Sequence, residues 1–223
     1  MNILLVFATE KEAALVGSIP QNGGYVEGIS VSDHRIQVCI TGVGGASTAW
    51  SLMNWFSLHG RPDIAINAGI AGSFNRQLKP GDVVMPQSDL FADAGIEIDS
   101  HFQTLFEYGL AAEDEPPFEN GLLVSRNIYT DKLAGIVKTA RAVTVNMASG
   151  SQSSIKKIKG KFNPDIETME GATFFYICGR EKVPFLALRA ISNYVEPGKR
   201  GKWEIPLALE RLREKVIEIL QIL

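Results

Sequence analysis

The sequence predicts an α/β fold built around a largely parallel sheet, and two of its features support this prediction. Short continuous apolar runs, of the length of strands buried on both faces, alternate with segments of helical periodicity. Of the 223 residues, 45% are apolar, which is enough for a sizeable core, and 21% are charged, as in ordinary globular proteins. Because no repeat, low-complexity segment or linker interrupts this pattern, we expect a single domain over residues 1–223.

The predicted strands are short, apolar and bounded by turn-forming residues. They are residues 3–8, 25–32, 35–41, 63–67, 83–86, 122–125, 142–145, 166–168 and 185–189. The helices predicted between and after them are residues 10–16, 46–59, 101–108, 131–139, 151–159, 171–180 and 203–223. The last helix has apolar residues at i, i+3/i+4 spacing, and residues 111–120, with consecutive prolines and acids, are predicted as a surface loop.

Charge and composition exclude several classes of function. The 22 Lys and Arg residues nearly balance the 25 Asp and Glu residues, which argues against a nucleic-acid-binding surface. Cys39 and Cys178 lie in apolar runs and predict no disulfide framework. His34, His59 and His101 lie at no metal-ligand spacing, so we expect no metal. Since neither a signal peptide nor a run of about 20 apolar residues is present, we expect a cytoplasmic protein with no membrane partner.

Two glycine-rich segments follow predicted strands, where α/β proteins bind ligands. Residues 42–47 precede a helix, but Ser47 occupies the position where a dinucleotide fingerprint requires glycine, so we expect no nicotinamide cofactor. On the residues alone, this segment is equally consistent with a tight turn or an anion site. Residues 68–72 form a second predicted turn, whose small residues allow a flat ligand to approach the backbone. They include no Lys or Arg and do not predict a phosphate clamp.

Three polar residues lie where chemistry is expected, each with a simpler alternative. Glu12 is a candidate catalytic acid, although an acid in a first helical turn can simply complement the helix dipole. Glu170 follows Met169 where a strand meets a helix, a position that directs a side chain into the ligand crevice, although it could again be only an acid at a helix N-terminus. Asn193 follows the next strand, facing the same crevice or simply forming a turn.

Several segments, in this order, resemble the nucleoside phosphorylase/nucleosidase superfamily and its methylthioadenosine/S-adenosylhomocysteine nucleosidase branch. They are residues 8–12, 41–44, 67–72, 81–84, 168–170 and 189–193, which span nearly the whole chain. The resemblance implies a three-layer α/β/α sandwich around a mixed, partly barrel-like sheet. It also implies a homo-oligomer, a dimer or higher, whose neighbouring subunits often complete the site, with residues 102–108 as a candidate contact.

The resemblance also assigns roles to residues in the matching segments. Glu12 would activate water, while Met169 and Glu170 would pack under the ribose and bond its hydroxyl groups. Asn193 stands where the family has an acid that engages the purine. Other residues in family-like segments are expected to bind substrate: Ile70, Ala71, Gly72, Thr168 and Asp93. Of these, Asp93 is expected to have only a supporting role. No metal or organic cofactor is required for this chemistry.

At Asn193 the chain departs from the adenine-specific pattern, which has Asp at this position. Asn cannot act as a general acid, but its amide can donate to O6 of a 6-oxopurine and accept from N7–H. A polar mismatch in a closed site costs about 1–3 kcal/mol, enough to set a preference for one base. We therefore predict hypoxanthine or guanine, rather than adenine, as the leaving base.

Residues 91–97, 168–171 and 191–203 resemble the futalosine hydrolase family. That resemblance implies removal of hypoxanthine from futalosine, in menaquinone biosynthesis. Futalosine carries an aryl carboxylate on its 5′ side, with which Arg200, Lys199 or Lys202 could pair, unless these residues form a solvated loop. Alternatives are a methylthioadenosine/S-adenosylhomocysteine nucleosidase, a non-catalytic nucleoside-binding protein, and a purine nucleoside phosphorylase. The absence of Arg from both glycine-rich segments favours water over phosphate as the nucleophile.

Overall fold

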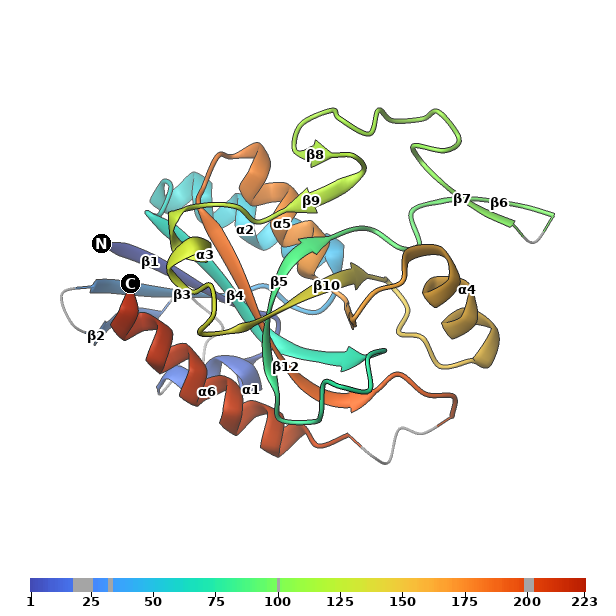
Figure 1. Ribbon diagram of the computed structural model, residues 1–223. Helices are drawn as coiled ribbons and strands as arrows, with labels where there is room; N and C mark the ends of the chain where they lie inside the picture. The colour runs from blue at the N-terminus through green and yellow to red at the C-terminus, as the bar shows by residue number, and fades with distance from the viewer. Residues whose placement is uncertain (18–25, 32–33, 100, 199–202) are drawn as a thin grey trace.

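A mixed sheet forms the centre of the molecule in the computed structural model, which describes residues 1–17, 26–31, 34–99, 101–198 and 203–223 (Figure 1). Within these residues the strands of this sheet are β1 (Asn2–Phe7), β2 (Val26–Val31), β3 (His34–Ile40), β4 (Ile64–Ser73), β5 (Val83–Asp89), β8 (Phe118–Glu119), β9 (Leu122–Val124), β10 (Lys138–Thr144), β11 (Ile166–Thr168) and β12 (Phe185–Tyr194). Their order in space is β2-β3-β1-β4-β11-β10-β5-β9-β8. β12 lies off this path, parallel to β4 and antiparallel to β5.

The position of β12 closes part of the sheet into a small barrel. Each of β4, β11, β10, β5 and β12 pairs with the next, and β12 pairs back to β4. Small and branched side chains from these strands fill the inside: Ala71, Val84, Ala140, Ala142, Ile166 and Ile191. Because β11 is antiparallel to β4 and parallel to β10, the sheet is mixed. The predicted partly barrel-like α/β architecture is confirmed.

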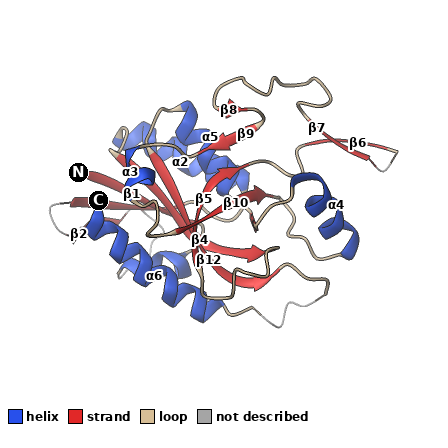
Figure 2. Cartoon of the chain, in the orientation of Figure 1, coloured by secondary structure: helices blue, strands red, loops and turns tan. Residues whose placement is uncertain are grey.

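Helices cover the two faces of the sheet and make the outer layers (Figure 2). α1 (Glu10–Ala13), the 3₁₀ turn η1 (Ala14–Val16) and α6 (Ile205–Ile222) lie on one face, and α2 (Gly45–His59) and α5 (Gly171–Arg180) on the other. Two further helices, α3 (Ile128–Lys132) and α4 (Gln152–Phe162), flank β10 in the chain. None of the helices in the described part of the chain is long and apolar enough to cross a membrane.

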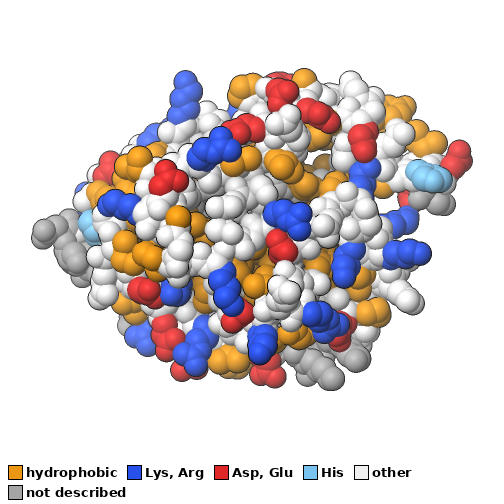
Figure 3. All heavy atoms as spheres, in the orientation of Figure 1, with side chains coloured by type: hydrophobic (Ala, Val, Ile, Leu, Met, Phe, Trp, Pro, Cys, Tyr) orange, Lys and Arg blue, Asp and Glu red, His pale blue; other side chains and the backbone are white. Residues whose placement is uncertain are grey.

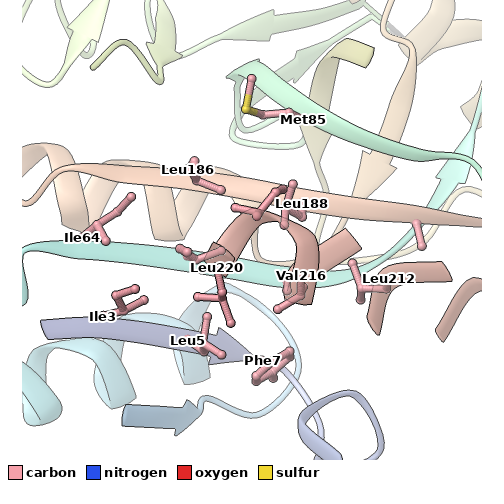
Figure 4. Close-up of a cluster of buried hydrophobic side chains, with 14 of the residues drawn as sticks. Ile3, Leu5, Phe7, Ile64, Met85, Leu186, Leu188, Leu212, Val216 and Leu220 are labelled. Atoms are coloured by element: carbon pink, nitrogen blue, oxygen red, sulfur yellow. The ribbon is translucent and has the colours of Figure 1, made fainter. Parts of the chain in front are cut away.

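Each layer of helices forms a hydrophobic core against one face of the sheet. Leu212, Val216 and Leu220 of α6 pack against Ile3, Leu5 and Leu188 of the strands, as the i, i+4 spacing predicts (Figure 4). On the other face, Trp55 and Phe56 of α2 meet Phe174 and Phe175 of α5. On the surface seen in Figure 3, Lys and Arg side chains are interspersed with Asp and Glu.

Two predicted helices are wrong. Residues 101–104 form β7 (His101–Thr104), which pairs with β6 (Gly95–Ile98), and Phe102 covers Gly95 where no side chain would fit. The helix predicted at residues 131–139 is α3, whose capping box at Asn127 starts it earlier. β10 then begins at Lys138, because Ala140 and Ala142 are needed inside the barrel. In both cases tertiary packing overrides local preference.

Two predicted strands are longer than expected, and this matters for the site. Residues 68–72, predicted as a turn, continue β4 to Ser73. β12 likewise runs on from the predicted end at residue 189 to Tyr194. Both extensions lie beside one another in the β4–β12 pairing, so the residues expected in loops stand on rigid strands.

Candidate active site

A cavity of about 680 Å³ lies where the carboxyl ends of β1, β4 and β12 meet. This is the size of a small-molecule site, and the position is the one where α/β sheets bind ligands. The structure brings most of the predicted site residues into its lining: Glu12, Ile70, Ala71, Gly72, Thr168, Met169, Glu170 and Asn193.

Glu12 is held at the cavity wall by bonds to two different elements. Thr9 caps α1 in a capping box, in which the carboxylate Oε2 of Glu12 accepts from the Thr9 backbone N–H at 3.1 Å. Oε1 accepts from the backbone N–H of Ile70 at 3.2 Å. A Cβ on Gly69 would lie 2.9 Å from Oε1, so a side chain at residue 69 would press on this carboxylate. Glu12 therefore caps its helix and also reaches the site.

Glu170 lies at the N-cap of α5, and its Oε1 accepts from the backbone N–H of Gly44 at 2.9 Å. The first glycine-rich segment therefore donates to a carboxylate of the protein itself. Burial raises the pKa of Glu170, and the negative charge of Glu12 adds to this, while the Gly44 N–H and the Arg189 charge oppose it. The electrostatic coupling places Glu12 and Glu170 around the same part of the cavity.

Arg189 is the cation beneath these carboxylates, and no role was predicted for it. It is 2% exposed, and its guanidinium donates to the Asn67 carbonyl at 2.8 Å, the Leu188 carbonyl at 3.0 Å and the Asn67 side-chain oxygen. Its β12 position lies opposite Gly69 of β4. A charged residue inside the apolar run of β12 was the sequence signal that could have identified it.

Asp89, at the end of β5, is a third acid near Arg189 and was not predicted either. It is 1% exposed, and burial raises its pKa to about 7. Its Oδ1 accepts from the Thr144 hydroxyl at 3.0 Å, and Thr144 in turn accepts from the backbone N–H of Ala172 at 2.7 Å. The Thr168 hydroxyl accepts from the Gly171 N–H at 3.2 Å and bonds Thr144 at 3.0 Å. This buried network fixes the start of α5 and hence Glu170.

The opposite end of the cavity carries uncharged and acidic hydrogen-bonding groups. Asn193 is half-buried; its Oδ1 accepts from the Ser192 hydroxyl at 2.7 Å and its Nδ2 donates to the Tyr194 carbonyl at 3.0 Å. A β-bulge between Ile191 and Asn193 brings Asn193 opposite Gly72. Glu167, also in the lining and not predicted, is 7% exposed.

Two predicted substrate-binding residues are not in the described lining. Asp93 is exposed, and its Oδ2 accepts from the Asn146 backbone N–H at 2.6 Å. It anchors the loop whose next residues, 148–150, line the cavity. Arg200, with Lys199 and Lys202, lies outside the described residues. Within the described ranges, no group of three or more His, Cys, Asp or Glu side chains is arranged to hold a metal.

The charges define what this arrangement can do chemically. One buried guanidinium faces Glu12, Glu170 and Asp89, whose negative charges oppose the lowering of the Arg189 pKa by burial. A cavity wall with more carboxylates than cations stabilises a positively charged centre and repels a dianion such as phosphate. Such a wall can stabilise a positive charge, and a carboxylate in it can accept a proton.

Comparison with known proteins identifies the family. The model of the phosphorylase superfamily matches residues 5–223, and the chain belongs to this superfamily. The futalosine hydrolase of Streptomyces coelicolor is 28% identical over 100% of this chain and 97% of its own length. The 5′-methylthioadenosine/S-adenosylhomocysteine nucleosidase of Buchnera aphidicola is 25% identical over 83% of this chain and 78% of its own.

Solved structures confirm the fold. The 5′-methylthioadenosine/S-adenosylhomocysteine nucleosidase of Neisseria meningitidis, in complex with methylthio-immucillin-A, superimposes with a TM-score of 0.82. The match covers 100% of this chain and 99% of that one at 21% identity. The family and the nucleosidase relatives together support the predicted enzyme class, an N-glycosyl hydrolase.

Proposed function

We propose that this protein is a futalosine hydrolase, which cleaves the N-glycosidic bond of futalosine with water and releases hypoxanthine and dehypoxanthine futalosine in menaquinone biosynthesis. The observation that carries the proposal is Asn193, a neutral amide held at one end of the cavity by Ser192 and Tyr194. An amide both donates and accepts, which suits O6 and N7–H of a departing 6-oxopurine. The full-length match to a futalosine hydrolase supports the same substrate.

The mechanism divides three tasks among residues of the lining. Asn193 stabilises the departing hypoxanthine by hydrogen bonds. Glu170, with Met169 beside it, binds the ribose hydroxyls and places negative charge near the oxocarbenium-like centre as the bond breaks. Glu12 removes a proton from the attacking water, a role worth typically about 10²–10⁴-fold in rate. Oε2 of Glu12 accepts from both the backbone N–H and the hydroxyl of Thr9, and Oε1 accepts from the Ile70 N–H, so the free acceptor site for the attacking water is on Oε1.

Water rather than phosphate is the proposed nucleophile. The argument from sequence was that no Arg lies in the glycine-rich segments, yet Arg189 lies beside Gly69 in the sheet. Arg189 is committed to three backbone and side-chain oxygens. Its charge also faces carboxylates that would repel a phosphate dianion. The arrangement therefore favours a hydrolase over a phosphorylase.

The mouth of the cavity supports a substrate with an acidic arm. Lys11, exposed at the start of the chain's first helix, is the cationic side chain among the described lining residues, and the same lining includes apolar residues such as Trp203 and Leu209. An aryl carboxylate on the 5′ side of the ribose could place its ring on the apolar surface and its charge near Lys11.

The second candidate function is a methylthioadenosine/S-adenosylhomocysteine nucleosidase, because relatives of that name are numerous. Product analysis separates the candidates. Futalosine, inosine and methylthioadenosine are each offered with and without phosphate, and the released base is measured. We expect hypoxanthine from futalosine at a rate independent of phosphate. Adenine from methylthioadenosine would support the second candidate, and phosphate dependence would support a phosphorylase. A homo-oligomer remains a prediction, which light scattering of the purified protein tests.

A further inference from the structure

Residues 146–150 form a loop of the cavity wall that has little burial of its own. The loop follows β10, and Ala148, Ser149 and Gly150 line the cavity. Four of its five residues are exposed, and Ser149 is partly buried. An exposed segment with few apolar contacts opens easily unless other interactions hold it. The position of this wall therefore depends on the groups that bond the loop.

Two carboxylates from outside the loop bond it, one near each end. Oδ2 of Asp93 accepts from the Asn146 backbone N–H at 2.6 Å, and Oδ1 accepts from the Asn146 side-chain amide at 3.2 Å. Oε1 of Glu167 accepts from the backbone N–H of Ser149 at 2.8 Å, and Oε2 accepts from the Ser149 hydroxyl at 2.5 Å. Glu167 thus fixes both the backbone and the side chain of Ser149.

The two anchors differ in their surroundings. Asp93 is exposed, whereas Glu167 is 7% exposed. Glu167 lies within β11, where it pairs with Val143 of β10 on one side and Gly72 of β4 on the other. Hydrogen bonds to a charged group are strong, and they gain strength away from water. Through this side chain, Ser149 is attached to the rigid barrel.

The anchored loop supports a second part of the wall. The carbonyl of Gly150 accepts from the backbone N–H of Gly198, which lies after β12 and also lines the cavity, at 3.3 Å. Glu12 and Glu170 lie on other elements, α1 and the start of α5. Loss of the Glu167 anchor should therefore loosen the wall and leave the catalytic carboxylates in place.

We propose that Glu167 is a positioning residue that holds the cavity wall at residues 148–150 through its two bonds to Ser149. The role requires hydrogen bonding and not charge. In Glu167→Gln, the amide oxygen would accept from the Ser149 N–H and the amide nitrogen would donate to the Ser149 hydroxyl, because a hydroxyl both donates and accepts. Glu167→Met introduces a side chain of similar length whose thioether is only a weak acceptor. This pair of variants separates anchoring from charge.

Steady-state kinetics with futalosine measures the role, and in its choice of substrate it rests on the proposed function. We expect Glu167→Met to raise KM by about tenfold or more, with kcat within about threefold of wild type, because the loop loses its buried partner. Glu167→Gln should keep KM within about threefold, since both bonds are remade. Equal increases in KM for the two variants would mean that Glu167 acts by its charge. An unchanged KM in Glu167→Met, or a fall in kcat alone, would also overturn the positioning role.

Amide hydrogen exchange of residues 146–151 reads the same anchor without any substrate. The Ser149 amide should exchange faster in Glu167→Met, by about tenfold or more, and should stay close to wild type in Glu167→Gln. Unchanged exchange in Glu167→Met would show that Glu167 does not hold the loop. If the wild type does not cleave futalosine, the proposed function is wrong, and the exchange rates still decide the role of Glu167.

Ser149→Ala provides a second test if Glu167→Met does not fold. Alone, it removes one of the two bonds and should raise KM only slightly, because the backbone N–H still donates to the carboxylate. Combined with Glu167→Gln, it leaves the amide nitrogen without an acceptor. The double variant should therefore raise KM by more than the product of the two single effects. Independent effects would mean that Glu167 does not act through Ser149.

Discussion

The two glycine-rich segments differ in what glycine contributes. In residues 42–47, Gly44 has a φ of +90°, and a Cβ there would meet nothing within 4 Å. In residues 68–72, Gly69 and Gly72 belong to the regular strand β4, but a Cβ on either would approach a neighbouring side chain to within 3.0 Å. Gly44 allows a backbone conformation, whereas Gly69 and Gly72 leave space.

The difference explains how each segment serves the site. The unusual backbone of Gly44 aims an N–H at Glu170, so the segment acts through hydrogen bonding. Gly69 clears room for the carboxylate of Glu12, and Gly72 separates Glu167 from Asn193. Composition alone does not distinguish the two uses, since both segments are rich in small residues. Substitutions can distinguish them, because backbone strain at Gly44 and steric collision at Gly69 or Gly72 have different consequences.

The largest effect on activity is expected from substitution of Glu12, the residue for whose carboxylate Gly69 leaves space. Glu12→Gln should lower kcat for futalosine by about 10²–10⁴-fold, because the amide cannot accept a proton from water. Its affinity for a non-hydrolysed substrate analogue, measured by calorimetry, should stay within a few-fold. Glu10→Gln, an exposed position in the same helix, is the matched control and should retain full activity. Equal loss of affinity and turnover in Glu12→Gln would indicate a structural role.

Gly69→Ala should show the cost of lost space. The new Cβ would press on Oε1 of Glu12 from 2.9 Å, and displacement of a catalytic group by about 1 Å can cost up to about 10²-fold in rate. Steady-state kinetics should show the fall in kcat. Gly160→Ala in α4, where a Cβ meets nothing within 4 Å, should leave kcat unchanged. Full activity in Gly69→Ala would show that Glu12 has room to move.

Gly44→Ala should instead show the cost of conformation. Gly44 and Gly60 both have positive φ, +90° and +80°, with free space at the Cβ position. Alanine at either should destabilise the fold by about 1–3 kcal/mol in urea unfolding, because positive φ with ψ near 180° is a conformation essentially restricted to glycine. Only Gly44→Ala should also reduce activity, since it moves the donor to Glu170. If both variants lost activity equally, the cause would be general destabilisation.

A smaller effect is expected from pH at Asp89, which also depends on a glycine that leaves space. A Cβ on Gly171 would lie 2.2 Å from Oδ2 of Asp89. The pKa of Asp89 is about 7 when folded and 3.8 in its ordinary state, so the unfolded chain gives up this proton at lower pH. The stability that protonated Asp89 contributes is therefore lost as pH rises through about 7.

Urea unfolding of wild type and Asp89→Asn at pH 6 and pH 7 measures this loss. Because Asn does not titrate, the wild type should lose about 1 kcal/mol relative to the variant between these values. A difference that does not change with pH would mean that the Asp89 pKa is not raised.

Most of the fold could be predicted from the sequence, and the errors in that prediction have one cause. The strands and helices that bury a continuous apolar run or face, such as β1, α2 and α6, were predicted close to their observed positions. The errors at residues 101–108 and 131–139 arise because strand pairing and barrel packing override local helical preference. The continuation of β4 through glycines was missed for the same reason, since its partner β12 supplies the hydrogen bonds.

The site was predictable where a residue follows a strand and less so where it lies within one. Glu12 and Glu170 were found because each follows a strand, and Asn193 because the predicted strand ended at residue 189, although β12 continues to Tyr194. All three line the cavity. Arg189 and Glu167 lie inside strands, and which face they present depends on pairing partners distant in the sequence. The importance of Asp89 comes from its burial against α5, and no local sequence pattern predicts this burial.

The bulge in β12 has a consequence for how such a protein diversifies. Before it, Leu188, Ala190 and Ile191 are buried in the cores, and after it Asn193 is only half-buried and faces the cavity. The extra residue uncouples the position that meets the base from the positions that hold the barrel together. A single exchange at residue 193, such as Asn193→Asp, would leave the hydrophobic packing of the strand intact. Natural selection could therefore change the preferred base through one codon, with little penalty in folding.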